Sequence, residues 1–530
     1  MTRIVATAVP MSGQSPATGQ VGVISHFQRR SWPARACIAG TTVGAFQRRV
    51  VSRRPLRNMR QAIWRGLFVF AASAATAGGA GVEKPNVVII LTDDQGTLDA
   101  RSFGSSDLET PAIDGLAARG IRFTQAYAHT VCVPARAMLM TGRHPQRSGI
   151  NSWTQSRMWG PRGINMALSE VTLAEVLREA GYRTALFGKW HLGAHPDHGP
   201  VKQGFDEFFG IRNGFIDNYA HYQLHGSGFH DLFEGDDEVF FRGQYFPDLI
   251  ADRAVSFIHR NQDRPFFLYY ALNLPHYPEQ ALARFEQRYS SLPEPRRSYA
   301  AMISTTDHYI DRVLTQLRAL DLQRKTIVIF MSDNGHSVEN YQISIDAHPS
   351  GHAKGHEYAK GGGGNTGRFI GAKGSFLEGG IRVPAILSYP SGLPQGIVRD
   401  QAITAMDWFP TILELCGIDP PKGVQFDGHS VLPLVKDAAA PGRYATMFWQ
   451  WEEGWAVREG NWKLIVGNTA GLDQTKVDGP YLANLADERP EAANHAAQHP
   501  DIVTRLTQRH REWAQEVVPK KPTDDPRAPR

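Results

Sequence analysis

The chain has 530 residues, 42% hydrophobic and 10% aromatic, so it can bury a large core, and bulk disorder is excluded. Its net charge of +5 originates in residues 1–82, which hold 11 arginines and no lysine or acidic residue. Of the 57 basic residues, 46 remain once these are set aside, against 52 acidic ones. The rest of the chain is therefore mildly acidic, and its charge does not indicate a nucleic-acid partner.

The first 82 residues are expected to be a leader. The basic stretch 59–65 precedes an apolar run and small residues, and together residues 59–80 have the pattern of a secretory signal peptide. Such a run is too short for stable membrane insertion. Residues 1–58 then form an upstream extension, with translation expected to start at Met59; a disordered leader is the alternative. We expect an exported protein, periplasmic or secreted.

From residue 83 to about 440 the pattern alternates between helices and strands. Continuous apolar, β-branched runs predict strands buried on both faces of a parallel sheet, at 86–92, 182–187, 265–272 and 326–331. Helical spacing with proline and glycine at the ends predicts helices at 110–120, 173–180, 298–320 and 408–416. Thr110 is the predicted cap of the first of these helices. The fold class is α/β, with a large, mainly parallel sheet flanked by helices, in a catalytic domain over 83–440.

Beyond residue 440 the pattern changes. Short aromatic strands in hairpin order are predicted at 444–450, 455–458 and 462–466, followed by a helix near 502–513. Residues 441–518 are therefore expected to form a smaller α+β subdomain with a short antiparallel sheet. Residues 519–530 have too little apolar content to fold and are predicted to be a flexible tail.

Polar residues gather just after the predicted buried strands. Open α/β sheets bind their ligands at this edge, so the residues are expected to lie together. Taken alone, His276 would more often be a satisfied histidine than a site residue. Four such coincidences predict one functional site, made of Asp93, Asp94, Lys189, His191, His276, Asp333 and Asn334.

Of the three cysteines, Cys132 is the candidate for a chemical role. It stands shortly before Pro134 and Arg136 at the start of a predicted helix, where backbone N–H groups attract anions. The alternative is a small buried hydrophobe, the commoner fate of a lone cysteine. Cys37 lies in the leader and Cys416 in a predicted core helix, so no disulfide framework is expected.

Four oxygen-bearing residues suggest a metal site. Asp93, Asp94, Asp333 and Asn334 supply hard ligands and no imidazole or thiolate, which suits calcium or magnesium better than zinc. Calcium is favoured, with magnesium as the alternative. The competing interpretation is that these residues cap neighbouring helices.

The motifs as a set resemble those of the type I, formylglycine-dependent sulfatases of the alkaline-phosphatase superfamily, and most of all the exported bacterial sulfatases of glycans. The similarity runs in order from about residue 84 to 515. Ala135 departs from the pattern, because many members have serine there, which affects only the efficiency of modification. The matching motifs are Asp93-Asp94, Cys132-x-Pro134-x-Arg136, Thr141-Gly142-Arg143, Gly188-Lys189-Trp190-His191, Pro275-His276, Ser332-Asp333-Asn334-Gly335, Gly371-Ala372-Lys373 and Glu378-Gly379-Gly380-Ile381-Arg382.

This resemblance implies that Cys132 is oxidised to formylglycine (3-oxoalanine) by a formylglycine-generating enzyme. One hydroxyl of the hydrated aldehyde attacks sulfur, and the other, once deprotonated, expels sulfate and restores the aldehyde. The modified Cys132 also joins the metal ligands Asp93, Asp94, Asp333 and Asn334, and the metal binds a sulfate oxygen.

The resemblance also implies roles for five further residues. Arg136, Lys189 and Lys373 neutralise the charge of the transferring sulfate. His276 and Lys373 contact the sulfate and help protonate the leaving oxygen, and His191 is the base that triggers elimination.

The expected substrate is a sulfated carbohydrate. The Gly/His-rich segment 346–367 could line its pocket or be a flexible loop, with His348, His352 and His356 solvated. Candidates for stacking on sugars or pairing with neighbouring anions, with core packing or solvent exposure as the alternative, are Trp153, Arg157, Trp159, Arg162 and Arg212.

Two rival functions are weighed against a sulfatase. A phosphodiester or phosphonate monoester hydrolase of the same superfamily tends to have histidine beside the second aspartate, where this chain has Asn334. A non-catalytic secreted glycan-binding homologue would be expected to have lost at least one site residue. All ten are present, which favours hydrolysis of sulfate esters.

Overall fold

The computed structural model describes residues 84–150, 165–467 and 479–517; the predicted leader and tail lie outside this part of the chain. Within it, 11 strands form one sheet in the order β12-β2-β11-β8-β1-β7-β3-β4-β5-β6, with β13 paired to β2. The strands are β1 (Asn86–Asp93), β2 (Ile121–Tyr127), β3 (Arg183–Lys189), β4 (Glu207–Ile211), β5 (Phe233–Glu234), β6 (Asp237–Glu238), β7 (Phe266–Pro275), β8 (Thr326–Ser332), β11 (Arg382–Ser388), β12 (Ile397–Arg399) and β13 (Ile403–Thr404).

The middle of this sheet is parallel. Strands β8, β1, β7, β3 and β4 run side by side in one direction, and Ile89 of β1 pairs with Ile329 on one side and Tyr269 on the other. Antiparallel pairing begins at β11 on one side and β5 on the other. The predicted mainly parallel α/β sheet is therefore confirmed, and its central strands β1, β7 and β8 are buried along their whole length, as their apolar runs require.

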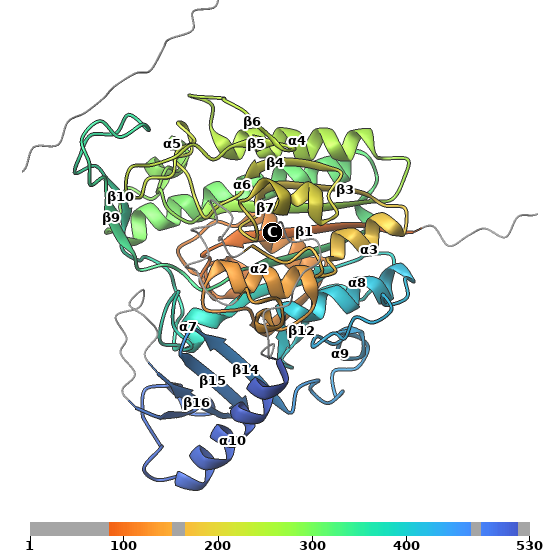
Figure 1. Ribbon diagram of the computed structural model, residues 1–530, viewed down its shortest axis with the longest axis vertical. Helices are drawn as coiled ribbons and strands as arrows, with labels where there is room; N and C mark the ends of the chain where they lie inside the picture. Colours follow the sequence, from red (N-terminus) through yellow and green to blue (C-terminus); the bar gives the residue numbers. More distant parts are fainter. Residues whose placement is uncertain (1–83, 151–164, 468–478, 518–530) are drawn as a thin grey trace, which may run out of the picture. The chain divides into compact units, whose positions relative to one another are not determined.

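Helices cover both faces of the sheet (Figure 1). Side chains of β1 alternate between two cores: Ile89 packs with α2, α3 and α8, and Ile90 packs with α1, α4 and α6. The helix α4 was not predicted from the sequence. The helices are α1 (Pro111–Ala118), α2 (Cys132–Thr141), α3 (Leu173–Glu179), α4 (Phe246–Arg260), α5 (Ala283–Arg288), α6 (Arg296–Ala319), α7 (Glu378–Ile381), α8 (Trp408–Cys416) and α9 (Leu432–Lys436).

The cap of α1 differs from the prediction. Thr110 occupies the N-cap position but makes no capping hydrogen bond through its side chain. Instead, the carboxylate of Asp307 on α6 accepts hydrogen bonds from the backbone N–H groups of Ala112 and Ile113, at 3.0 and 2.9 Å. A carboxylate from a neighbouring helix can satisfy two of these donors at once, so it replaces the local hydroxyl.

Strands β9 (Asn340–Gln342) and β10 (Glu357–Lys360) pair as a two-stranded sheet of their own. Residues after 440 form a four-stranded antiparallel sheet, as expected, which we call the second sheet. Its strands are β14 (Thr446–Trp451), β15 (Gly454–Glu459), β16 (Trp462–Val466) and β17 (Tyr481–Asn484), and the helix α10 (Pro500–Val517) packs on it. Leu506 of α10 contacts the core that Val457 and Leu464 form on one face. The other face packs through Trp449 and Ile465 against Tyr127 and Phe376 of the preceding part of the chain.

A buried ion network joins this second sheet to α7. The Lys463 ammonium donates to Glu378 at 2.9 Å and to Glu491 at 2.8 Å, and the side chains of Lys463 and both glutamates are almost wholly buried. Tyr127 on β2 donates to Glu378 at 2.7 Å, so three elements meet on one carboxylate.

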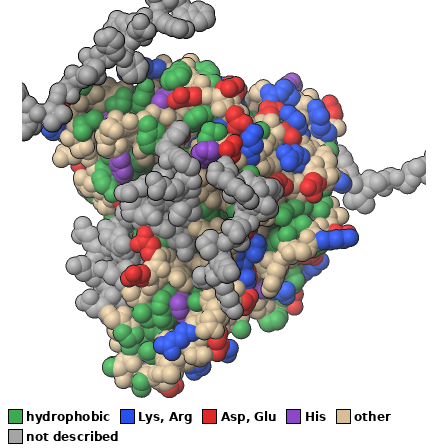
Figure 2. Space-filling view, in the orientation of Figure 1, with side chains coloured by type: hydrophobic (Ala, Val, Ile, Leu, Met, Phe, Trp, Pro, Cys, Tyr) green, Lys and Arg blue, Asp and Glu red, His purple; other side chains and the backbone are tan. Residues whose placement is uncertain are grey.

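The surface carries mixed charges. On the face seen in Figure 2, basic and acidic side chains lie interspersed, consistent with the near balance of acids and bases after residue 82. Among the described helices, none combines the length and apolar character needed to span a bilayer.

Lys463→Met should lower the free energy of unfolding by about 3–5 kcal/mol, because Glu491 would be left buried without a cation and Glu378 would keep only Arg382. Denaturant unfolding measures this. The exposed Lys436→Met is the matched control and should change stability little; equal losses in both variants would contradict the role of the network.

Candidate active site

Four adjacent parallel strands end at the same edge of the sheet. Their order β8-β1-β7-β3 brings together Asp333, Asp93, His276 and Lys189, each at or just after the end of its strand. Gly188 permits the close approach of β3 to β7, since a Cβ there would lie 1.8 Å from the Ala271 carbonyl oxygen. The polar residues predicted at strand ends are therefore assembled into one site.

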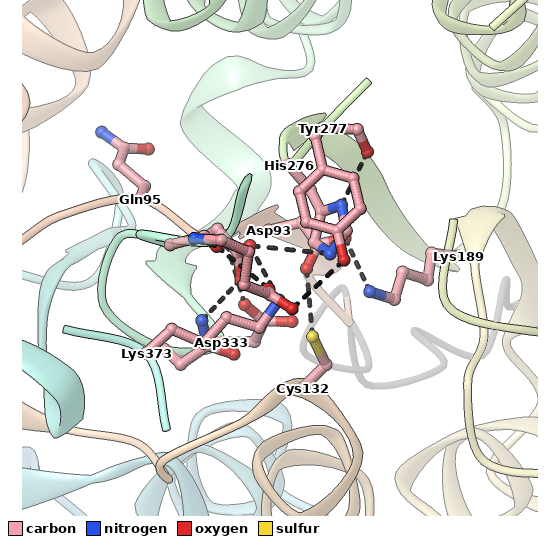
Figure 3. Close-up of polar contacts among 12 residues, drawn as sticks. Asp93, Gln95, Cys132, Lys189, His276, Tyr277, Asp333 and Lys373 are labelled. Atoms are coloured by element: carbon pink, nitrogen blue, oxygen red, sulfur yellow. Dashed lines mark hydrogen bonds and ion pairs between the residues drawn. The ribbon is translucent and has the colours of Figure 1, made fainter. Parts of the chain in front are cut away.

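Cys132 is the first residue of α2, as the sequence predicted. Its Sγ lies 3.4 Å from Oδ1 of Asp93, and Figure 3 shows it pointing from the helix toward the carboxylates at the strand ends. Burial raises the pKa of the thiol well above its usual value, and the charges of Asp93 and Asp333 act in the same direction. The unmodified thiol is therefore a poor nucleophile in this site.

Arg136 lies about one turn further along α2 and holds two strand ends. Its guanidinium donates to Oδ2 of Asp333 through Nε at 3.0 Å and through a terminal nitrogen at 2.7 Å. Another nitrogen donates to the backbone carbonyl of Lys189 at 3.0 Å. The side chain is fully buried, so the pairing fixes the orientation of Asp333.

The predicted metal ligands form one buried cluster. Oxygen atoms of Asp93, Asp94 and Asp333 and the sulfur of Cys132 all lie within 4.8 Å of one another. Asn334 donates through its amide nitrogen to Asp94 at 2.6 Å, while its Oδ1 is buried and has no partner among the described residues. An amide oxygen without a partner beside three carboxylates is a donor set that fits a hard divalent cation.

The electrostatics of these carboxylates also favour a cation. Burial and the neighbouring negative charges raise the pKa of Asp94 to about 6 and that of Asp333 to about 7. Burial acts to raise the pKa of Asp93 too, but the positive charges of Lys189 and Arg136 help to hold it well below its usual value. A divalent cation would relieve the repulsion among the three groups.

Two lysines and a histidine complete the inner site (Figure 3). Lys189 donates to Asp93 at 2.7 Å, and Lys373, from the loop before α7, donates to Asp94 at 2.9 Å. The pKa of Lys373 rises well above its usual value, because Asp94 and Glu339 outweigh the effect of burial. His276 places Nε2 3.6 Å from Asp94, and its Nδ1 lies 2.7 Å from the Tyr277 carbonyl oxygen.

His191 stands beside this cluster with both ring nitrogens buried and without a partner among the described residues. Burial, together with the positive charges of Lys189 and Arg136, lowers its pKa well below 6.5, so the imidazole is neutral. Its backbone has φ 58°, in the left-handed region that histidine adopts only occasionally. A neutral, unpaired imidazole has a ring nitrogen available to accept a hydrogen bond from a group bound in the site.

Of the candidates for contact with the sugar or its neighbouring anions, the structure describes only Arg212. Trp153, Arg157, Trp159 and Arg162 lie outside the described residues. Arg212 does not face a substrate: it is 1% exposed, stacks on Phe233 and pairs with Asp236 at 3.0 Å. The ring of Phe233 on β5 lies against the guanidinium of Arg212, and Asp236 provides its counter-charge.

Histidines of the Gly/His-rich segment 346–367 make specific side-chain contacts. His352 pairs with Asp217 at 2.7 Å and stacks on His356, and His348 lies 2.8 Å from the Ser350 hydroxyl. Sequence reasoning missed several residues that line the site, among them Tyr277 and Glu339. Glu339 follows the end of β8 by a few residues, a position that the strand-end rule could have flagged.

Comparison with known proteins identifies the family. Residues 85–418 match the family model described as Sulfatase, which covers more than half of the chain. The chain belongs to the sulfatase family. Its fold and the order of its motifs are those of the type I sulfatases in the alkaline-phosphatase superfamily, and it is a sulfuric ester hydrolase.

The similarity extends over most of several relatives. The chain is 30% identical over 510 residues to N-acetylgalactosamine-6-sulfatase of Canis lupus familiaris, covering 87% of this chain and 91% of the relative. It is 29% identical over 502 residues to arylsulfatase J of Mus musculus, covering 85% and 79%. Among solved structures, Ps i-CgsB in complex with k-i-k-neocarrahexaose has a TM-score of 0.69 and 27% identity, covering 82% of this chain and 93% of the other.

Adding calcium or magnesium to chelator-treated protein should raise its melting temperature, because an ion that binds only the folded site stabilises it, by about 2.7 kcal/mol at 100 times its Kd. Thermal melts against ion concentration measure this. Asp333→Asn should abolish the ion-dependent shift, whereas Asp311→Asn on the outer side of α6 should retain it. An equal shift in both variants would place the ion elsewhere.

Proposed function

We propose that this sulfatase hydrolyses sulfate esters of carbohydrates, with Cys132 in its formylglycine form and Ca²⁺ held by Asp93, Asp94, Asp333 and Asn334 together with residue 132. The observation that carries the proposal is the buried carboxylate cluster in contact with Cys132 at the N-terminus of α2. The similarity to N-acetylgalactosamine-6-sulfatase and to Ps i-CgsB in complex with k-i-k-neocarrahexaose supports a sulfated sugar as substrate.

The bound cation would polarise a sulfate oxygen and favour the ionised nucleophile. Arg136 holds Asp333 and Lys189 holds Asp93, so the two residues keep the ligand oxygens oriented and offset their charge. The anion also meets the N-terminus of α2, whose backbone N–H groups face negative charge.

Lys373 is the group best placed to protonate the leaving oxygen. It stays an ammonium, because its pKa is raised by Asp94 and Glu339, and it lines the same cavity as Cys132. His276 donates its Nδ1 proton to the Tyr277 carbonyl, so Nε2 can donate only when the ring is protonated, which a bound sulfate favours. His191, neutral and unpaired, takes a proton from the second hydroxyl of the hydrate so that sulfate leaves.

Maturation and export belong to the same proposal. Cys132 is 4% exposed in the folded protein, so a formylglycine-generating enzyme would reach it before the fold closes. Export to the periplasm or the medium rests on the pattern of residues 59–80, and sulfated polysaccharides would be the source of its substrates.

The purified enzyme, co-expressed with a formylglycine-generating enzyme, should release inorganic sulfate from at least one member of a panel of sulfated mono- and oligosaccharides. Ion chromatography detects the sulfate, and peptide mass measurement over residue 132 reports the modification. Cys132→Ala should release none. Faster turnover of phosphate diesters than of every sulfate ester would overturn the proposal.

His191→Ala should release the desulfated sugar in a single burst of about one per modified active site and then stall, because no base remains to trigger elimination. Rapid quench followed by peptide mass measurement should find sulfate retained on the peptide that contains residue 132. The matched control is His259→Ala, an exposed histidine at the end of α4 that lines no part of the site, and this variant should turn over normally. Steady turnover by His191→Ala without retained sulfate would remove this role.

A further inference from the structure

A cavity opens from Cys132 past groups that the proposed reaction does not use. It has a volume of about 110 Å³, so a group that enters it lies against its walls. Cys132, His191, His276 and Lys373 line it. Val131, Val133 and Gly214 also line it, and the part of the lining that we term the leaving-group wall consists of Phe215, Gln223, His225, Tyr277, Glu339 and Tyr341.

Most of this wall is aromatic and uncharged. Phe215 stacks near His276 with ring centres 5.4 Å apart and meets Tyr277 edge-on at 4.8 Å, and His225 meets Tyr341 edge-on at 4.6 Å. Burial lowers the pKa of His225 to about 4, so this ring carries no charge at neutral pH. Such a surface suits the C–H face of a sugar, and its aromatic members carry no positive charge that would attract a neighbouring anion.

Glu339 is the exception, a carboxylate held rigidly in the wall. Its Oε2 accepts from Lys373 at 3.1 Å and from the Ser337 hydroxyl at 3.0 Å. Its Oε1 accepts from the hydroxyls of Tyr277 and Tyr341 at 3.3 and 3.2 Å. Its side chain is only 7% exposed, so the four bonds keep the negative charge in one place.

The position of this charge relative to the reacting group is defined by Lys373. When the Lys373 ammonium donates to the leaving oxygen, Glu339 is its neighbour on the wall. The two carboxylates that pair with Lys373 are also close together: oxygens of Asp94 and Glu339 and a nitrogen of His276 lie within 4.8 Å of one another. The part of the sugar adjacent to the ester oxygen must therefore pass beside Glu339. A second sulfate or a carboxylate there would face a fixed like charge in a partly desolvated site.

We propose that Glu339 is a specificity-determining residue that makes the site select sugars whose sulfate ester has uncharged neighbours, and reject units with a second anion beside it. This inference rests on the proposed sulfatase function and narrows its substrate to singly sulfated, otherwise neutral sugar units. Hydroxyl and acetamido groups fit the wall because they carry no charge against the carboxylate.

The test compares kcat/KM for N-acetylgalactosamine 6-sulfate and its 4,6-disulfate, or the corresponding pair for whichever panel sugar is hydrolysed fastest. The wild type should favour the singly sulfated sugar by about tenfold or more. Glu339→Gln keeps the shape and removes the charge, so this preference should shrink about tenfold even if both rates fall with the altered contact to Lys373. Glu294→Gln, a glutamate that pairs with Lys360 on the surface, is the matched control and should leave the preference unchanged.

The outcomes separate the two proposals. Equal losses of Glu339→Gln on both sugars would show that Glu339 only supports the fold or Lys373, and would overturn the inference. A wild-type preference for the disulfated sugar would also overturn the inference. This measurement needs no variant, so the inference can be tested even if the Glu339→Gln protein does not fold. Release of sulfate from no sugar at all would instead refute the proposed function.

Discussion

Three carboxylates, those of Asp93, Asp94 and Asp333, are buried at one edge of the sheet with their oxygens within 4.8 Å of one another. Buried like charges repel strongly, so this arrangement needs compensating cations. Arg136, Lys189 and Lys373 each pair with one of the three, and all three cations are nearly or fully buried. The charges of the cluster are therefore close to balanced, and among its ligand oxygens Oδ1 of Asn334 has no hydrogen-bond partner among the described residues.

The supports of this cluster come from distant parts of the chain. Asp94 has φ 66°, and the hydroxyl of Tyr299 on α6 donates to its backbone carbonyl at 3.0 Å while accepting from the N–H of Gly96. Lys373 is positioned by backbone bonds of its loop to the His336 carbonyl and the Thr130 carbonyl. Side chains held from several elements lose little freedom when a ligand binds, which suits a site that must stabilise developing charge.

The second sheet serves the same site indirectly. Lys463 and Tyr127 meet on Glu378, the first residue of α7, and the loop with Lys373 lies just before this helix. The C-terminal segment therefore stabilises the end of α7 next to the active-site loop, through an ion network that excludes water. Glu339 pairs with Lys373 and accepts a hydrogen bond from Tyr277, so it links the inner site to the aromatic wall of the cavity.

Local patterns in the sequence determined much of this protein: the buried strands from their apolar runs, Cys132 at a helix start, and the polar residues at strand ends. These features depend on residues close together in the chain, so periodicity and motif order were sufficient to predict them. Tertiary structure alone decided the partners. The carboxylate of Asp307, not the hydroxyl of Thr110, caps α1. Arg212 pairs with Asp236, and Glu339 pairs with Lys373. Strand order and the packing of distant segments bring such pairs together, and neither is encoded in a local pattern.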